Sequence, residues 1–148
     1  MIFDDYGYFR NYCVKCDKLY TVIYEKWCKS CQINYLKENF TNWTSGNEKI
    51  DNFIQETQLK INEQSDIIFE WIPYNNFDNI NEINKYAFYT IYSAIWKDGP
   101  LLWEYWNENY GKKTDRKKVA LKCFHNSQNI NDDFLNEVLF YEFDFLNT

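Results

Sequence analysis

Two stretches in the first half of the chain carry apolar residues at helical spacing. In segment 32–43 the apolar positions recur at intervals of three and four, and they are Ile33, Leu36, Phe40 and Trp43. A second such series begins at Ile50 and continues through Phe53 and Ile54. Spacings of this kind place the apolar side chains on one face of an α-helix. The pattern therefore predicts two helices, and segment 44–47 (Thr-Ser-Gly-Asn) is expected to end the first and cap the second.

The second half of the chain changes to strand patterning. Segments 90–97 and 119–124 are rich in apolar and β-branched residues and are predicted to be strands. Alternation along 119–124 puts Ala120 and Lys122 on one face and Val119 and Cys123 on the other, so Cys123 is expected to be a buried thiol. A helix is then predicted to begin near Asp132.

An insert at 101–118 separates these two strands. It is aromatic at first and then basic. We expect an extended hairpin that packs on the strand-rich lobe of the second half of the chain, and a segment that binds nucleic acid or a protein partner is the alternative.

Composition narrows the class of protein. The chain has 148 residues, of which 45% are hydrophobic and 21% aromatic, and this predicts a packed core. Its net charge of −6 argues against attraction to nucleic acid or anionic membrane. No apolar run approaches the roughly 20 residues of a membrane helix. The first residues show no basic and apolar signal regions, so a cytoplasmic location is expected, with the nucleus as a further possibility.

Four of the five cysteines form two pairs with the same spacing. Cys13 and Cys16 make one Cys-x-x-Cys pair, Cys28 and Cys31 make the other, and eleven residues lie between them. Two such pairs joined by a short hairpin can supply four thiolates to one tetrahedral zinc ion. Four protein ligands leave no open position, so the predicted zinc is structural. A redox dithiol is the alternative interpretation.

A strand lysine and a later helix glutamate in this chain resemble a protein-kinase N-lobe. Lys122 ends the sequence Val-Ala-Leu-Lys, and Glu137 follows fifteen residues later. The resemblance implies that Lys122 and Glu137 pair to hold nucleotide phosphates, and that Ala120 and Ile91 line the adenine site. Upstream, the paired cysteines, the stretch 42–47 and the Glu-Trp-Ile-Pro-Tyr of 70–74 resemble the N-terminal regions of tyrosine-kinase-like kinases.

The chain departs from the kinase pattern at the phosphate loop. The three positions that carry glycine in the family are Asn84, Tyr86 and Tyr89 here. Side chains at these positions crowd the space in which backbone N–H groups approach the phosphates, so at most weak ATP binding is expected. No catalytic loop or magnesium-binding aspartate follows Glu137 in the sequence. We therefore expect a truncated, inactive kinase-like domain with a binding or regulatory role and a protein partner.

Two other functions stay open from the sequence. The chain could be an ATP-binding kinase component that acts only with a C-lobe from a longer product. It could also be a zinc-dependent adaptor that binds protein or nucleic acid, although the acidic charge of the chain argues against nucleic acid. An exposed lobe surface predicts self-association.

The expected fold class is α+β. A zinc-knuckle-like hairpin and two helices precede a partial kinase N-lobe, which consists of a small antiparallel sheet and the helix that carries Glu137. The predicted divisions are a cysteine-rich module at 8–45, a helical linker at 46–75 and the kinase-like lobe at 76–148.

Overall fold

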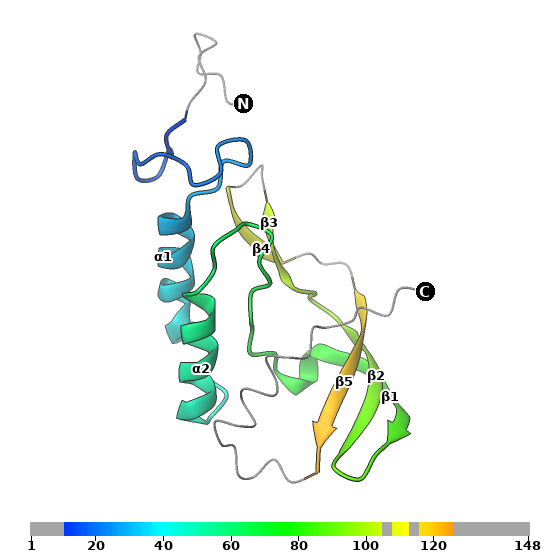
Figure 1. The fold of residues 1–148 in the computed structure, drawn as a ribbon. Helices are drawn as coiled ribbons and strands as arrows, with labels where there is room; N and C mark the ends of the chain where they lie inside the picture. The colour runs from blue at the N-terminus through cyan, green and yellow to red at the C-terminus, as the bar shows by residue number, and fades with distance from the viewer. Residues whose placement is uncertain (1–10, 105–107, 113–115, 126–148) are drawn as a thin grey trace.

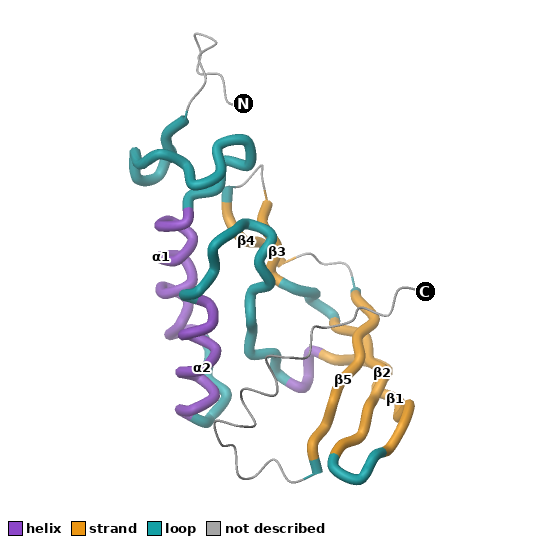
Figure 2. Tube along the Cα trace, in the orientation of Figure 1, coloured by secondary structure: helices purple, strands orange, loops and turns teal. Residues whose placement is uncertain are grey.

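A computed structural model describes residues 11–104, 108–112 and 116–125 (Figure 1). The fold is α+β, as the sequence predicts. The helical elements are α1 (Lys29–Asn39), a 3-10 turn (Phe40–Asn42), α2 (Glu48–Gln58) and a second 3-10 turn (Tyr74–Asn76). The strands are β1 (Phe77–Lys85), β2 (Tyr89–Trp96), β3 (Leu101–Glu104), β4 (Asn109–Lys112) and β5 (Lys117–Phe124). Figure 2 shows the cysteine-rich loops at one end and the three longest strands at the other.

The two predicted helices are present. Helix α1 begins directly after Cys28, earlier than the apolar pattern indicates, and its Leu36 is buried. Helix α2 begins after Asn47, whose side-chain oxygen accepts hydrogen bonds from the backbone N–H groups of Lys49 and Ile50. These bonds satisfy two donors that have no partner within the helix. The predicted cap is therefore confirmed.

The segment before α2 is fastened to the helix by one carboxylate. Asp51 accepts hydrogen bonds from the hydroxyls of Thr44 and Ser45 and from the Ser45 backbone N–H. These bonds hold the pKa of Asp51 below its ordinary value, with the Ser45 hydroxyl as the largest cause. The residues that link α1 and α2 are thus ordered by local side-chain bonds.

Three antiparallel strands form a sheet in the order β1-β2-β5. Its buried face carries Ala94, Trp96 and Val119, against which Ile72 and Leu121 pack. The predicted alternation in β5 is confirmed at Val119, which is only 3% exposed.

One prediction for β5 is wrong, because Cys123 is exposed. Cys123 pairs with Thr90 next to the last residue pair of the β2–β5 ladder, and β5 is an outer strand of this sheet. Its position near the end of an outer strand leaves the thiol at the surface.

The insert between β2 and β5 forms the hairpin β3–β4, as predicted. It does not join the three-stranded sheet, however. Tyr110 is buried with Trp27 and Leu36 in one cluster, and Leu101 and Trp103 pack against it. The rings of Trp103 and Tyr110 meet edge to face with centroids 5.8 Å apart. The hairpin therefore packs on the N-terminal part of the chain, and one apolar core joins segments far apart in sequence.

Among the helices of the described residues, none combines the length and apolar character needed to cross a bilayer.

Candidate metal centre

The first cysteine pair lies on a tight turn. The Cys13 backbone N–H donates to the Lys18 carbonyl at 2.7 Å, and the Asp17 N–H donates to the Cys13 carbonyl at 2.9 Å. Asp17 adopts a left-handed conformation with φ 56°, which aspartate tolerates better than most residues. An antiparallel bridge between Tyr12 and Leu19 closes the turn from outside. The Cys-x-x-Cys spacing lets both sulfurs face the inside of this turn.

The second pair lies where a small hairpin meets helix α1. Val22 and Trp27 form an antiparallel bridge, so the chain turns back within a few residues. Cys28 then occupies the N-cap position of α1, and Cys31 lies in its first turn. The Lys29 N–H donates to the Thr21 hydroxyl at 3.0 Å and ties the hairpin to the helix. The helix start thus fixes the second pair.

The four sulfurs converge on one point. All four Sγ atoms lie within 4.8 Å of one another. The Cys13–Cys31 and Cys16–Cys28 Sγ pairs are each 3.6 Å apart. A tetrahedral ion with metal–sulfur bonds of about 2.3 Å requires sulfurs about 3.8 Å apart. These two separations are close to that value, and the four cysteines are positioned to bind a metal ion.

The protonation chemistry differs among the thiols. A hydrogen bond with the Lys18 backbone is the largest cause that lowers the pKa of Cys16, to about 7. Burial raises the pKa of Cys28 and of Cys31 above the ordinary value. A bound cation reverses the second effect, because thiols that coordinate a metal are deprotonated. The group is therefore a soft donor set that a divalent cation would complete.

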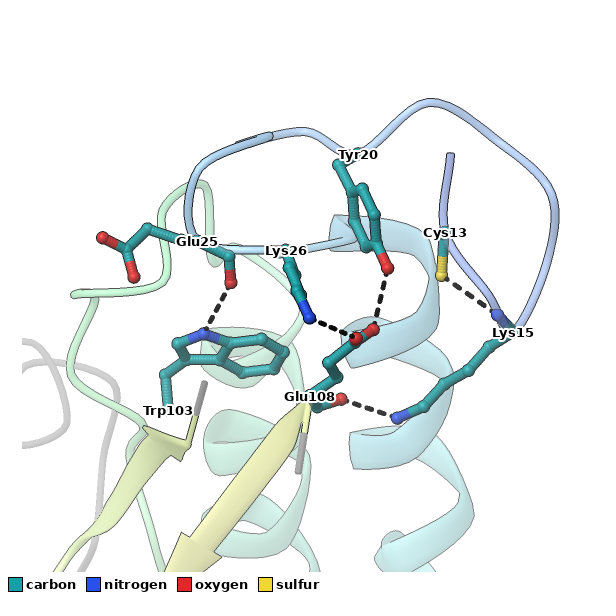
Figure 3. A network of polar contacts seen from close by, with 7 residues as sticks. All are labelled: Cys13, Lys15, Tyr20, Glu25, Lys26, Trp103 and Glu108. Atoms are coloured by element: carbon teal, nitrogen blue, oxygen red, sulfur yellow. Dashed lines mark hydrogen bonds and ion pairs between the residues drawn. The ribbon is translucent and has the colours of Figure 1, made fainter. Parts of the chain in front are cut away.

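A network of polar contacts joins this cysteine group to the β3–β4 hairpin (Figure 3). At its centre is Glu108, which directly precedes β4. Its carboxylate accepts a hydrogen bond from the Tyr20 hydroxyl at 2.8 Å and forms an ion pair with Lys26 at 3.6 Å. Its backbone carbonyl accepts from the Lys15 ammonium at 2.6 Å and from the Gln32 amide at 3.4 Å. The hairpin is thus bonded to both cysteine loops and to α1.

Apolar packing supports the same contact. Trp27 is fully buried directly before Cys28 and packs in the cluster that includes Tyr110. The Trp103 indole N–H donates to the Glu25 carbonyl at 3.1 Å. Tyr20 is 4% exposed beside Cys13 and Cys28. Burial, followed by the hydrogen bond to Glu108, raises the pKa of Tyr20, so its hydroxyl stays a donor at neutral pH.

Three of the residues predicted to bind nucleotide share one face of the sheet. Ile91 pairs directly with Lys122, and Ser93 pairs with Ala120. Directly opposed residues in an antiparallel ladder project to the same side, as do residues two apart. Ile91, Ala120 and Lys122 therefore lie together on the face opposite Val119. The fourth predicted residue, Glu137, lies outside the described residues.

Aromatic rings surround the Lys122 ammonium. Its Nζ lies 4.1 Å from the ring centroid of Tyr89 and 4.8 Å from that of Phe124. The Tyr89 ring in turn lies against Tyr86, with centroids 4.7 Å apart. Both contacts with Lys122 are within the range of cation–π attraction. The Tyr89 side chain, at one position where the kinase family has glycine, therefore contacts the Lys122 ammonium.

The turn between β1 and β2 is fastened by His125. The His125 N–H donates to the Phe88 carbonyl at 3.0 Å, and its ring nitrogens contact the Ala87 carbonyl and the hydroxyl of buried Thr90. The sequence alone gave His125 no role. Glu108 and Gln32 were also missed, because their contacts join positions up to 93 residues apart. No local spacing signals such contacts.

Comparison of the chain with protein-family models, with curated proteins and with solved structures finds no match.

Proposed function

We propose that this chain is a zinc-dependent binding module. A structural zinc ion orders its N-terminal loops, and its kinase-like strand lobe does not catalyse phosphoryl transfer. The convergence of the Cys13, Cys16, Cys28 and Cys31 sulfurs carries the proposal. Zinc favours four sulfur ligands in a tetrahedron and has no redox chemistry of its own. With all four positions filled by protein, the ion stabilises the fold and takes no part in a reaction.

The surface of this module is best suited to binding another protein. Its loops expose large apolar side chains, namely Tyr12, Val14, Leu19 and Tyr24. Tyr12 and Leu19 are bridge partners, so they lie side by side. Exposed apolar groups held on a rigid scaffold are typical of protein-binding surfaces. The net charge of −6 disfavours nucleic acid.

The proposal that the lobe is inactive is based on the residues at its expected phosphate loop. A kinase phosphate loop needs close approach of backbone N–H groups to the ligand. Here the rings of Tyr86 and Tyr89, at two of the positions where the family has glycine, lie against each other, and the Tyr89 ring contacts the Lys122 ammonium. A nucleotide would have to displace both rings and their cation–π contact before its phosphates met the lysine.

ATP binding is the second candidate, and one observation favours it. Ile91 and Ala120 lie on the same face as Lys122, which is the arrangement that an adenine site beside a phosphate-binding lysine requires. Such a site would bind nucleotide through the base and ribose.

A titration with ATP and magnesium separates the two candidates. The zinc-loaded chain is followed by thermal denaturation beside a Lys122→Ala variant. The binding module predicts no saturable rise in the midpoint of either protein. A saturable rise in the wild type that Lys122→Ala abolishes would replace the proposal with the nucleotide-binding candidate. A ligand present at a hundred times its Kd stabilises the folded protein by about 2.7 kcal/mol, which is readily measured.

A further inference from the structure

Glu108 contacts residues beside both cysteine pairs. Figure 3 shows its side chain directed toward Tyr20 and Lys26, while its backbone carbonyl meets Lys15. The fourth contact is the Gln32 amide. Its carboxylate is only 14% exposed, and Lys26 is 18% exposed, so their ion pair is largely removed from solvent. An ion pair of this kind is screened much less by salt than a surface pair.

The first cysteine loop supplies two of these donors. Lys15 lies between Cys13 and Cys16, and its backbone N–H also lies 3.4 Å from the Cys13 sulfur. Tyr20 follows the same loop and packs against Cys13. The positions of both donors therefore depend on the loop that holds the first pair of sulfurs.

Residues beside the second cysteine pair supply the other two donors to Glu108. Lys26 lies two residues before Cys28, at a left-handed position with φ 50°. Gln32 directly follows Cys31 on α1 and is 1% exposed. Because one residue of the hairpin binds donors beside both pairs, its bonds can form together only when the two pairs are held side by side.

We propose that Glu108 is a positioning residue of the metal centre, through which occupancy of the four-cysteine site and docking of the β3–β4 hairpin are coupled. The inference rests on the proposed zinc site and adds its regulation. Metal binding fixes the two cysteine loops and so preorganises the four donors. Docking of Glu108 in turn holds the loops in the metal-binding geometry. Thermodynamic linkage makes the two effects equal in size.

Charge also favours the coupling. Four thiolates around a divalent cation carry a net charge of −2. Lys15 and Lys26 are the ammonium groups that bond to Glu108, and both lie within two residues of a ligand. Glu108 therefore holds two cations that are close in sequence to the ligands of an anionic site. Loss of the Glu108 contacts would release them toward solvent.

Zinc affinity of the full chain, measured by competition with a chromophoric chelator, tests the inference. We expect Glu108→Gln to weaken binding about tenfold, as is usual when a residue that supports metal ligands is changed. Lys15→Met should act in the same direction, since it removes a donor to the Glu108 carbonyl and leaves the carboxylate in place. Glu82→Gln, on the exposed part of β1, makes the same change of charge and should leave the affinity unaltered.

Hydrogen exchange supplies a second readout, which separates coupling from a general loss of stability. Zinc should slow exchange of the β3 and β4 amides in the wild type, and it should slow them less in Glu108→Gln by the same factor as the loss in affinity. A lower melting point with unchanged zinc affinity in both variants would overturn the inference and leave the zinc site intact. A wild-type chain that binds no zinc would overturn both.

Discussion

At the scale of single residues, Cys16 offers the most direct change to the metal centre. Cys16→Ser removes one of four ligands and adds little bulk. Structural zinc sites contribute roughly 10–16 kcal/mol in isolated fingers, so one ligand in four corresponds to about 3 kcal/mol, or about a hundredfold in affinity. Competition titration with a zinc chelator measures this loss.

Cys123 provides the matched control for that substitution. It is the cysteine outside the cluster, and it is exposed on β5. Cys123→Ser makes the same sulfur-to-oxygen change and should leave zinc affinity unaltered. Equal losses in the two variants would contradict the assignment of the ligands.

Acid should release the metal, and the sign follows from the thiols. Burial raises the pKa of Cys28 and Cys31, so without metal both are protonated at neutral pH and must each lose a proton on binding. Affinity therefore falls as pH falls, by at least about a hundredfold per pH unit for two released protons. A titration of zinc affinity between pH 8 and 6 checks the slope. A slope of zero would contradict coordination by these thiols.

The grouping of the four cysteines could be predicted from the sequence, whereas the residues that contact them could not. Cys13 and Cys16 are near in sequence, so their spacing alone indicates that both sulfurs can reach one ion. Glu108 meets them only through contacts between distant segments. Its neighbours in sequence carry no pattern that distinguishes it from other surface carboxylates.

At the scale of elements, the start of α2 carries a prediction of its own. Asn47→Ala removes the oxygen that accepts from the Lys49 and Ile50 N–H groups. Loss of such a cap costs about 1 kcal/mol, which should lower the melting temperature by about 2–6 °C. Asn47→Asp keeps the acceptor and should retain most of the stability. Similar melting points for the Ala and Asp variants would show that the cap contributes nothing.

Strands β2 and β5 were predictable to within a few residues, whereas the extent of β1 and the surroundings of all three strands were not. Alternation in 119–124 correctly placed Val119 inside and Lys122 on the other face. It could not reveal that Tyr89 and Phe124 would approach the Lys122 ammonium, because ring orientation depends on how two strands are paired. Cys123 illustrates the same limit, since alternation assigns a face but not its depth of burial.

At the scale of the whole molecule, one apolar cluster spans residues 27–110, and Leu36 is among its most buried members. Leu36→Ala should destabilise the chain by about 2–5 kcal/mol through lost burial and the cavity left behind. Because the cluster joins α1 to the β3–β4 hairpin, the hairpin and the helix should unfold in the same urea transition. Urea unfolding at saturating zinc, followed by circular dichroism and by hairpin amide exchange, measures this. Separate transitions would contradict a shared core.

The docking of the hairpin is the feature of the fold that lay furthest from prediction. The aromatic pattern of 101–118 indicated a hairpin correctly, since strand pairing there is local. The predicted packing on the lobe was wrong, because Trp103 and Tyr110 pack beside Trp27 rather than on the three-stranded sheet. Which of two apolar surfaces a hairpin covers is decided by shape and by partners such as the Glu25 carbonyl.

X-ray absorption at the zinc edge of the purified, zinc-loaded chain tests the central claim most directly. The account predicts one zinc per chain with four sulfur neighbours at about 2.3 Å and no nitrogen or oxygen in the first coordination sphere. The Cys16→Ser variant should lose one of these sulfurs. A chain that retains no zinc, or a zinc surrounded by nitrogen and oxygen, would contradict the claim that the four cysteines form its metal centre.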